Sequence, residues 1–366
     1  MVRAPWKLPR PEGCAGLRVA VAQRLDHCDR AMSNCPDLHC FNGRLGAPAA
    51  HQTRCAVRSQ ALRYRSDARR RNRWRPMDVV AEGQPRSTLR SRDDEYSCSP
   101  TEFTRACHLI YRLAGISIAE SKQGMVSSRL ARRVRALALP NLGSYLDLIE
   151  RSGAGHAETQ EFINALTTNL TAFYREPHHF ETLTRYLSER RGGAAPRLWC
   201  AAASTGEEAY SIAMTVDEAC GANSGARLLA TDIDTRALAD ARRGVYRLDA
   251  ARRCGEARLK RHFLRGCGAQ QGLARIRPAL AQRIEFAPLN LLDPSWPVVQ
   301  SFASRLDAVF CRNVLIYFDK PTQARVIDRL ARVLRPGGLL FVGHAENLTE
   351  HREQFTLRGK SVYERR

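Results

Sequence analysis

Apolar residues recur at helical spacing in the stretch that begins near Ser99. Between Phe103 and Ala114 they follow the i, i+3 and i+4 pattern of one helical face. Ser99 or Thr101 can cap this helix, and Gly115 ends it. Further helices are predicted, in chain order, at about 122–137, 142–151, 158–166 and 178–190. The helix that contains Phe103 and Ala114 and the next three helices form a small all-helical domain. The helix at 178–190 leads into the next domain.

From Pro196 onward, short apolar runs alternate with helical patterns. Strands are predicted at 197–201, 227–231, 283–288, 306–311, 338–343 and in part of 355–363, and helices near 207–220, 235–243 and 322–334. The residues Arg335 to Gly338 are predicted to end the last helix in a turn. This alternation predicts an α/β fold with a mostly parallel, doubly wound sheet. The segment 249–278 interrupts the rhythm with glycines around a short turn.

The first 95 residues show neither a period of two nor a period of 3.6. They include the arginine-dense run Arg69–Arg75, which could bind nucleic acid. The favoured interpretations are a disordered extension or a mis-annotated start, with Met77 as the true initiator. The predicted organisation is a basic extension at 1–95, a helical domain and linker at 96–180, and a sheet domain at 181–366 with an insert at about 249–278.

Composition narrows the class of protein. The chain has 366 residues and a formal net charge of +21, which favours acidic partners or nucleic acid. No two of the 12 cysteines form a C-x-x-C pair, so we expect no metal site and reduced thiols in a cytoplasmic protein. No apolar run approaches about 18 residues, so no membrane insertion is expected. The N-terminus lacks the apolar segment of a signal peptide.

A small-residue loop is the first candidate site. The strand at 197–201 runs through it to Gly206 and into a helix that begins at Glu207. In open α/β folds such a loop lets the backbone approach a nucleotide-like ligand. Asp232 ends the next strand, about where these folds place the acid that binds ribose hydroxyls. A helix N-cap is the alternative role for Asp232, although Asp234 suits that role better.

Three sequence blocks carry a family resemblance: TTNLTAFYRE at 167–176, LWCAAASTGEE at 198–208 and FCRNVLIYF at 310–318. With ATDID at 230–234 and GHAEN at 343–347, they resemble the CheR-type chemotaxis receptor methyltransferases, which are protein-glutamate O-methyltransferases. The resemblance extends from about Tyr96 to the end. Tyr174 stands where the family usually has Phe, and Ala209 where it usually has Pro.

The resemblance implies a fold and an activity. The fold is a Rossmann-like methyltransferase domain with an antiparallel last strand, a small all-helical N-terminal domain and a small β-subdomain at the insert. The activity is transfer of a methyl group from S-adenosyl-L-methionine to glutamate side chains of chemoreceptors. The products are glutamate 5-O-methyl ester and S-adenosylhomocysteine, and the role is sensory adaptation in chemotaxis.

The resemblance also implies the site residues. The expected cofactor contacts are Asn169, Thr171, Arg175, Gly206, Glu207, Asp232, Asn290, Leu291, Arg312, Asn313 and Val314. Arg175 and Tyr317 are the candidate catalytic residues, and Arg175 could orient the substrate carboxylate by a forked pair. Structural alternatives stay open: a first-turn helix acid for Glu207, an ion pair with Glu176 or Glu181 for Arg175, and a core aromatic for Tyr317.

A basic helix is the candidate docking surface for acidic receptor helices. Its arginines are Arg129, Arg132, Arg133 and Arg135. A solvated helix face is the alternative. In some family members the β-subdomain pairs with a peptide at the receptor's C-terminal end by strand addition. We expect a monomer that does not bind nucleic acid. Two other functions stay open, a nucleic-acid methyltransferase and a catalytically inactive chemosensory binding module.

Overall fold

The computed structural model describes residues 74–76, 98–190 and 193–366. Most of the predicted extension 1–95 therefore lies outside the described residues, and so does Met77. The strand β1 (Trp74–Pro76) is its one described element. Among the described residues, no helix is long and apolar enough to cross a membrane.

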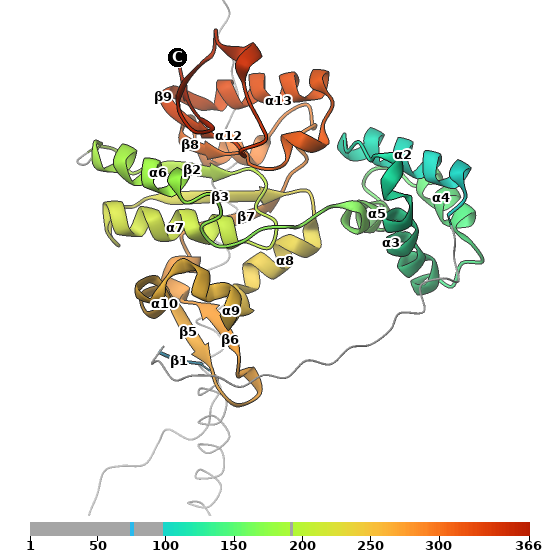
Figure 1. Cartoon of the computed structure of the whole chain (residues 1–366), viewed down its shortest axis with the longest axis horizontal. Coiled ribbons are helices and arrows are strands. Elements are labelled where there is room, and N and C mark those ends of the chain that lie inside the picture. The colour runs from blue at the N-terminus through green and yellow to red at the C-terminus, as the bar shows by residue number, and fades with distance from the viewer. Residues whose placement is uncertain (1–73, 77–97, 191–192) are drawn as a thin grey trace, which may run out of the picture. The chain divides into compact units, whose positions relative to one another are not determined.

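Residues 98–166 form a helical unit with its own apolar core, drawn in blue-green in Figure 1. Its elements are α2 (Pro100–Ala114), the 3-10 turn η3 (Glu120–Lys122), α3 (Gln123–Ala136), α4 (Leu142–Arg151) and α5 (Ala157–Leu166). The ends of α2 follow from its sequence. The Ser99 hydroxyl accepts the N–H of Glu102 while the Glu102 carboxylate accepts the N–H of Ser99, and Gly115 ends the helix at a left-handed φ of 68°.

The second unit contains a seven-stranded sheet in the order β10-β11-β9-β8-β2-β3-β7. Its strands are β2 (Arg197–Cys200), β3 (Arg227–Asp232), β7 (Ile284–Pro288), β8 (Leu306–Phe310), β9 (Leu334–Phe341), β10 (Phe355–Gly359) and β11 (Val362–Arg365). The five strands from β9 to β7 are parallel, and β11 runs antiparallel to β9 and β10. The predicted α/β fold with an antiparallel last strand is confirmed.

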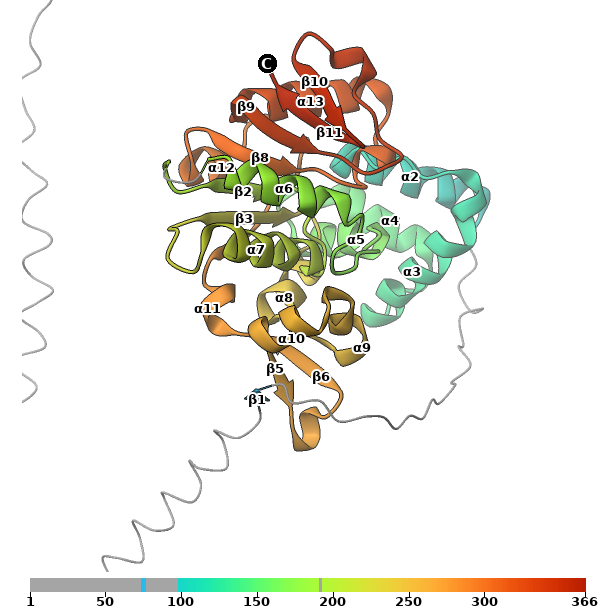
Figure 2. The same ribbon diagram turned by 60° about the vertical axis from the view of Figure 1, so that its left-hand side comes forward.

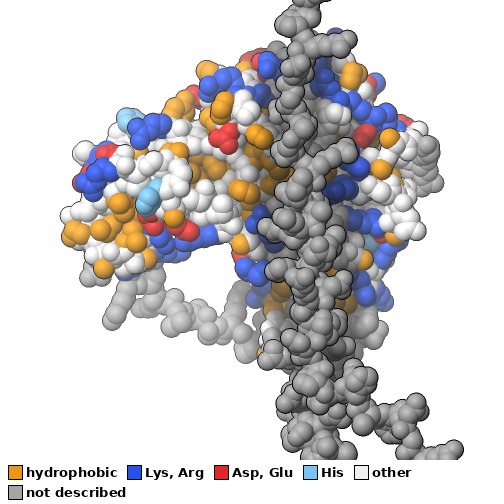
Figure 3. All heavy atoms as spheres, turned by 180° about the vertical axis from the view of Figure 1, so that it is seen from behind, with side chains coloured by type: hydrophobic (Ala, Val, Ile, Leu, Met, Phe, Trp, Pro, Cys, Tyr) orange, Lys and Arg blue, Asp and Glu red, His pale blue; other side chains and the backbone are white. Residues whose placement is uncertain are grey.

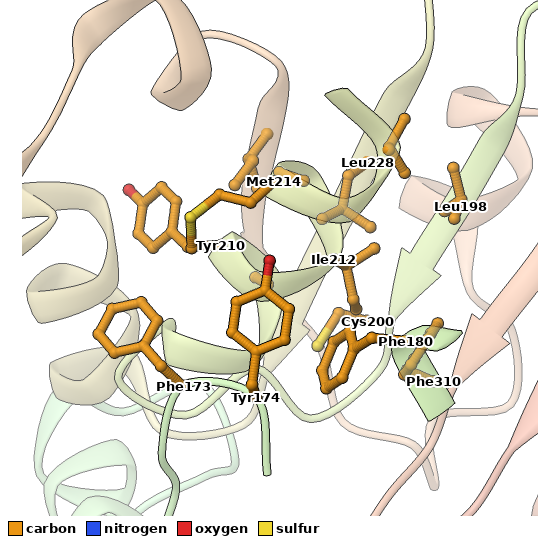
Figure 4. Close-up of a cluster of buried hydrophobic side chains, with 14 of the residues drawn as sticks. Phe173, Tyr174, Phe180, Leu198, Cys200, Tyr210, Ile212, Met214, Leu228 and Phe310 are labelled. Carbon is orange, nitrogen blue, oxygen red and sulfur yellow. The ribbon is translucent and has the colours of Figure 1, made fainter. Parts of the chain in front are cut away.

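Helices cover both faces of this sheet. The helices α6 (His178–Ser188) and α7 (Glu207–Cys220) lie on one face, and α12 (Pro297–Phe302) and α13 (Lys320–Val333) lie on the other (Figure 2). Phe173 and Tyr174, from the segment that links the two units, point into the first of these cores beside Tyr210 (Figure 4). The link is thereby anchored to the sheet unit by its aromatic side chains.

A small antiparallel β-subdomain occupies the insert. Its strands, β4 (Val245–Arg247), β5 (Phe263–Gly266) and β6 (Leu273–Ile276), pair with β1 in the order β1-β5-β6-β4. The helix α8 (Thr235–Arg243), which packs on β3 and β7, precedes β4. Short helical segments accompany the strands of the subdomain: α9 (Leu248–Ala251), η4 (Arg252–Cys254), α10 (Glu256–His262), η5 (Gly268–Gln270) and α11 (Pro278–Ala281). A Cβ at Gly266 would lie 1.9 Å from the backbone oxygen of Gln270, so the turn after β5 requires glycine there.

The structure corrects the prediction for the segment Arg335 to Gly338. The sequence places it in a turn before a strand at 338–343, but β9 already begins at Leu334. Leu334 pairs with Leu306 and Leu339 pairs with Ala308, so the intervening residues form an irregularity within the strand. A bulge accommodates the extra residues without ending the pairing.

Candidate active site

A cavity of about 480 Å³ lies at the carboxyl ends of β2, β3 and β8, where residues of the helical unit and of the link 167–177 also line it. Open α/β sheets hold ligands at this edge. The predicted residues that line it are Arg129, Asn169, Thr171, Arg175, Asp232, Asn290, Leu291, Arg312, Asn313, Val314 and Tyr317. Gly206, Glu207, Arg132, Arg133 and Arg135 lie outside its lining.

The small-residue loop places Glu208, and not Glu207, at the cavity. The Glu207 carboxylate accepts the Thr205 hydroxyl at 2.6 Å, off the cavity. Gly206 has a φ of 98°, and a Cβ there would lie 2.8 Å from the Ala241 Cβ and the Tyr246 hydroxyl. Gly206 is therefore required by packing against α8 and β4. Neither Gly206 nor Glu207 lines the cavity, and that these two residues contact the cofactor stays a prediction.

Arg312 joins three parts of the site. Its guanidinium, which is fully buried, lies 2.7 Å from Glu208 Oε2 and 3.2 Å from Glu176 Oε2. It also donates to the backbone oxygen of Arg175 at 2.8 Å. Burial raises the pKa of Glu208, and Arg312 opposes that rise. Burial is also the largest single influence on Glu176, but Arg312, His344 and His179 together outweigh it and lower the pKa of Glu176.

Asp232 lies at the end of β3 and is nine-tenths buried. Its carboxylate accepts the backbone N–H of Ser204 at 2.7 Å and that of Asp234 at 2.8 Å. Burial raises its pKa to about 6 in spite of these two bonds. Asp234, and not Asp232, caps α8, by accepting the N–H groups of Arg236 and Ala237. The side chain of Asp232 is thus free of a capping role.

The link 167–177 contributes Asn169 and Arg175. The Asn169 amide donates to the Asp234 carboxylate at 2.7 Å, which fixes its orientation. The Arg175 guanidinium donates to the backbone oxygen of Leu170 at 2.9 Å. The alternative ion pair with Glu176 does not form, because Glu176 pairs with Arg312 and His344.

Two residues of the predicted set also tie the helical unit to the sheet unit. The Asn290 amide donates to the backbone oxygen of Leu113 at 2.9 Å, and its oxygen accepts the N–H of Leu292. The backbone oxygen of Tyr317, in the turn η6 (Leu315–Tyr317), accepts the N–H of Ser117 at 2.9 Å. The two units therefore meet around the cavity, with residues of both in its wall.

A buried acid, Glu346, fixes the loop after β8. Its carboxylate accepts four backbone N–H groups, those of Asn313, Leu315, Ile316 and Gly343, with the shortest bond at 2.6 Å. Asn313 has a φ of 56°, a left-handed conformation that asparagine tolerates better than most residues. The carboxylate thus stabilises the backbone that presents Asn313 and Val314 to the cavity.

The basic helix α3 is partly structural. Arg133 pairs with the buried Glu158 through two bonds of 2.9 and 2.7 Å, and Tyr145 donates to the same carboxylate. Arg129 donates to the backbone oxygen of Thr167 at 2.7 Å and lines the cavity. Arg132 and Arg135 are exposed. Two of the four predicted docking arginines are therefore exposed, Arg133 also stabilises the helical core, and docking by this helix stays a prediction.

Glu176, His178 and His179 lie close enough together to hold a metal ion. Both histidines, however, place Nε2 3.2 Å from the backbone oxygen of Lys360. Glu176 is already paired with the Arg312 guanidinium, whose charge opposes a cation. Burial lowers the pKa of His179 to about 4, so the imidazole is neutral at pH 7. These contacts give all three side chains a structural role.

The sequence interpretation did not assign Glu208, Lys122 or Met125 to the site, although all three line the cavity. Lys122 and Met125 come from η3 and α3, and their sequence context carries no ligand signal. Glu208 stands beside Glu207, and only the angle at which α7 approaches the sheet decides which acid faces the cavity.

The strand order, the reversed last strand and the acid at the end of β3 define the class of Rossmann-like, S-adenosylmethionine-dependent methyltransferases. The family model "CheR methyltransferase, SAM binding domain" matches residues 169–363, and "CheR methyltransferase, all-alpha domain" matches residues 101–167. The chain belongs to the CheR methyltransferase family.

Relatives in this family are similar over most of their length. The chemotaxis protein methyltransferase of Klebsiella aerogenes is 49% identical over 266 residues, which are 72% of this chain and 89% of the relative. That of Escherichia coli is 47% identical over 76% of this chain and 95% of the relative. Chemotaxis protein methyltransferase 2 of Pseudomonas aeruginosa is 45% identical over 74% and 95%.

The side chains in the cavity fit the cofactor S-adenosylmethionine. Its ammonium group calls for an acid and its ribose hydroxyls call for an acceptor, and the carboxylates of Glu208 and Asp232 in the cavity lining are groups of these kinds. The apolar side chains of Ile233 and Leu291 lie in the same wall and can cover an adenine ring. Both carboxylates are buried with raised pKa values, so ligand groups that donate hydrogen bonds would relieve their desolvation.

Proposed function

We propose that this methyltransferase esterifies glutamate side chains on the cytoplasmic domains of chemoreceptors and so serves sensory adaptation in chemotaxis. Family membership and the chemotaxis methyltransferases similar to it support this proposal. The observation that carries it is the cavity, which combines buried acids for the cofactor with Arg175 at its wall. An arginine can orient an incoming carboxylate by two parallel bonds.

The reaction needs alignment more than it needs a base. The side chain of an unperturbed glutamate, with a pKa of about 4.3, is already ionised at neutral pH. One of its oxygens forms the new C–O bond to the methyl carbon while the C–S bond of the sulfonium breaks, and the electron pair stays on sulfur. No proton is transferred. The cofactor supplies the methyl group on a positively charged sulfur, and the protein aligns the two reactants and excludes water.

The chain's residues divide this work. Asp232 accepts from the ribose hydroxyls, and Glu208 takes the place of Glu207 as the acid for the ammonium group. Asn290 and Leu291 lie at the adenine, while Asn169, Thr171, Asn313 and Val314 complete the walls. Arg175 and Tyr317 face the reacting groups. Arg312 acts through Glu208 and Arg175, whose positions its buried guanidinium fixes.

Receptor docking falls to surfaces outside the cavity. Arg132 and Arg135 on α3 can steer an acidic receptor helix, since complementary charge raises the rate of association. Lys and Arg side chains are also spread over several elements of the face in Figure 3. The β-subdomain is the candidate site for a receptor C-terminal peptide. The enzyme acts as a cytoplasmic monomer in this proposal.

Incubation of the full chain with methyl-labelled S-adenosylmethionine and receptor-containing membranes tests the function. A glutamate methyl ester releases labelled methanol in base, and we expect this release to depend on the receptor. Label in nucleic acid that resists base would instead support a nucleic-acid methyltransferase. Cofactor binding without any incorporation would support an inactive binding module.

A further inference from the structure

The β-subdomain has a strand edge that a segment of this chain itself covers. In the order β1-β5-β6-β4, β1 is the edge strand, and without β1 the edge strand would be β5. β1 comes from outside the subdomain and is separated from the next described residue, Cys98, by the 21 residues 77–97. Edge strands bind extended segments through backbone hydrogen bonds, whatever chain supplies the segment.

The pairing between β1 and β5 is short. It consists of three residue pairs, in which Trp74, Arg75 and Pro76 face Gly266, Arg265 and Leu264. Proline has no N–H to donate to a ladder. Hydrogen-bonded and non-hydrogen-bonded pairs alternate in antiparallel sheets, so the pair of Arg75 and Arg265 is the one that can exchange both bonds. A contact of this size contributes little stability and can be displaced.

Charge also disfavours this occupant. The segment 69–76 contains five arginines and no acid. The subdomain at 245–277 contains nine Lys and Arg against two acids. Like charges on the two sequences weaken their association, and the same subdomain attracts an acidic segment. The edge of β5 therefore combines a weak basic occupant with a surface that favours an acidic one.

We infer that Trp74–Pro76 is an intramolecular competitor that occupies the β5 edge and must leave before an extended acidic peptide can pair there. A covalently attached segment competes at an effective concentration on the order of millimolar. With an intrinsic dissociation constant of similar order, it weakens peptide binding by about two- to tenfold. This inference rests on the proposed function in so far as that proposal names the β-subdomain as a peptide site, and it adds the segment of this chain that competes for the site.

Hydrogen exchange on the full chain tests whether the edge is covered. Arg75→Pro removes the N–H of the central pair, and Arg71→Pro places the same substitution outside β1 as the matched control. We expect faster exchange across Phe263–Gly266 in Arg75→Pro and unchanged exchange in the control. Equal exchange across Phe263–Gly266 in the unmodified chain and in both variants would overturn the inference. Protection that rises with protein concentration would also overturn it, because it would indicate pairing between two copies.

Peptide binding tests the competition. The probe is a labelled hexapeptide of alternating Glu and Val, with a Lys-Val hexapeptide as the charge control, followed by fluorescence anisotropy. Arg75→Pro should bind the acidic probe about two- to tenfold more tightly than the unmodified chain or Arg71→Pro. Equal affinity in the three chains, or a preference for the basic probe, would contradict the inference. Neither measurement uses cofactor or receptor, so a negative outcome is distinguishable from a failure of the proposed methyl transfer.

Discussion

The Arg312 guanidinium lies 2.7 Å from the Glu208 carboxylate, and both side chains are buried at the end of the parallel sheet. The same guanidinium donates to the backbone of Arg175. A single buried cation therefore connects the acid at the cavity with the link that carries a candidate catalytic residue. In the proposed function, this pair links the binding of the cofactor to the position of Arg175.

Replacement of Arg312 should lower both the free energy of unfolding and the rate of methyl transfer. Arg312→Met leaves Glu208 buried without its cation, which should lower the free energy of unfolding by about 3–5 kcal/mol. Urea denaturation measures this loss, and Arg332→Met, at an exposed position on α13, is the control. If the two residues act as a pair, the double variant with Glu208→Gln should lose less than the sum of the single losses. Additive losses would contradict the coupling.

Glu208 and Glu207 form a matched pair for testing the cofactor contact. Glu208→Gln should weaken S-adenosylhomocysteine binding by about tenfold or more, because a hydrogen bond to a charged group contributes about 1.5–3 kcal/mol. Glu207→Gln should change it less than about twofold, since its carboxylate is bonded to Thr205 off the cavity. Calorimetry on the two folded variants decides the assignment, and the reverse order of effects would restore Glu207 as the ligand acid.

Cofactor binding should weaken in mild acid. The pKa of Asp232 is about 6, and in the proposed function the ribose hydroxyls donate to its ionised form. Below that pH the protonated fraction rises, so affinity should fall by about fivefold from pH 6 to pH 5 and approach a tenfold loss for each further pH unit. Titration of S-adenosylhomocysteine between pH 5 and 8 measures the slope. Asp232→Asn should bind weakly and with little pH dependence over this range; an unchanged slope would exclude Asp232 as its source.

Tyr174→Phe should leave the protein as stable or make it more stable. The Tyr174 hydroxyl is buried and makes no hydrogen bond of normal geometry in the described part of the chain, although the nearby Thr215 side chain opposes the rise in its pKa that burial causes. An unsatisfied buried polar group costs about 1–3 kcal/mol, and phenylalanine keeps the ring contacts with Phe180. Thermal unfolding should therefore give an equal or higher midpoint. A clear loss of stability would indicate that the hydroxyl bonds to a group such as a buried water.

Local sequence signals predicted most element boundaries. The bounds of α4, α7 and α8 agree with the sequence prediction because their caps are readable, as at Asn141 and Asp234. The order of the family blocks placed most of the predicted cofactor set around one cavity. Partners distant in sequence were not predictable. Arg133 forms an ion pair with Glu158 at the helical core, and no sequence pattern near Arg133 predicts this pair.

Contacts between residues distant in sequence also decide which of two neighbouring residues on one helical turn faces the cavity. Glu207 and Glu208 differ by about 100° around α7, and the orientation of α7 depends on contacts with α6 and the sheet. The bulge at Arg335 to Gly338 is a further case, since proline and two glycines are equally typical of a chain reversal. These features are set by tertiary packing, which overrides local preference.

Because of the four hydrogen bonds that Glu346 accepts, the conformation of the loop at 313–316 depends on a residue distant in sequence. An acid near the C-terminus sets the path of the loop at 313–316, some thirty residues earlier. A chimera that takes the loop at 313–316 from one relative and the segment around Glu346 from another would combine a loop with an acid from a different protein. Deletion of the last two strands with this acid would reshape the cofactor wall even though neither strand borders the cavity.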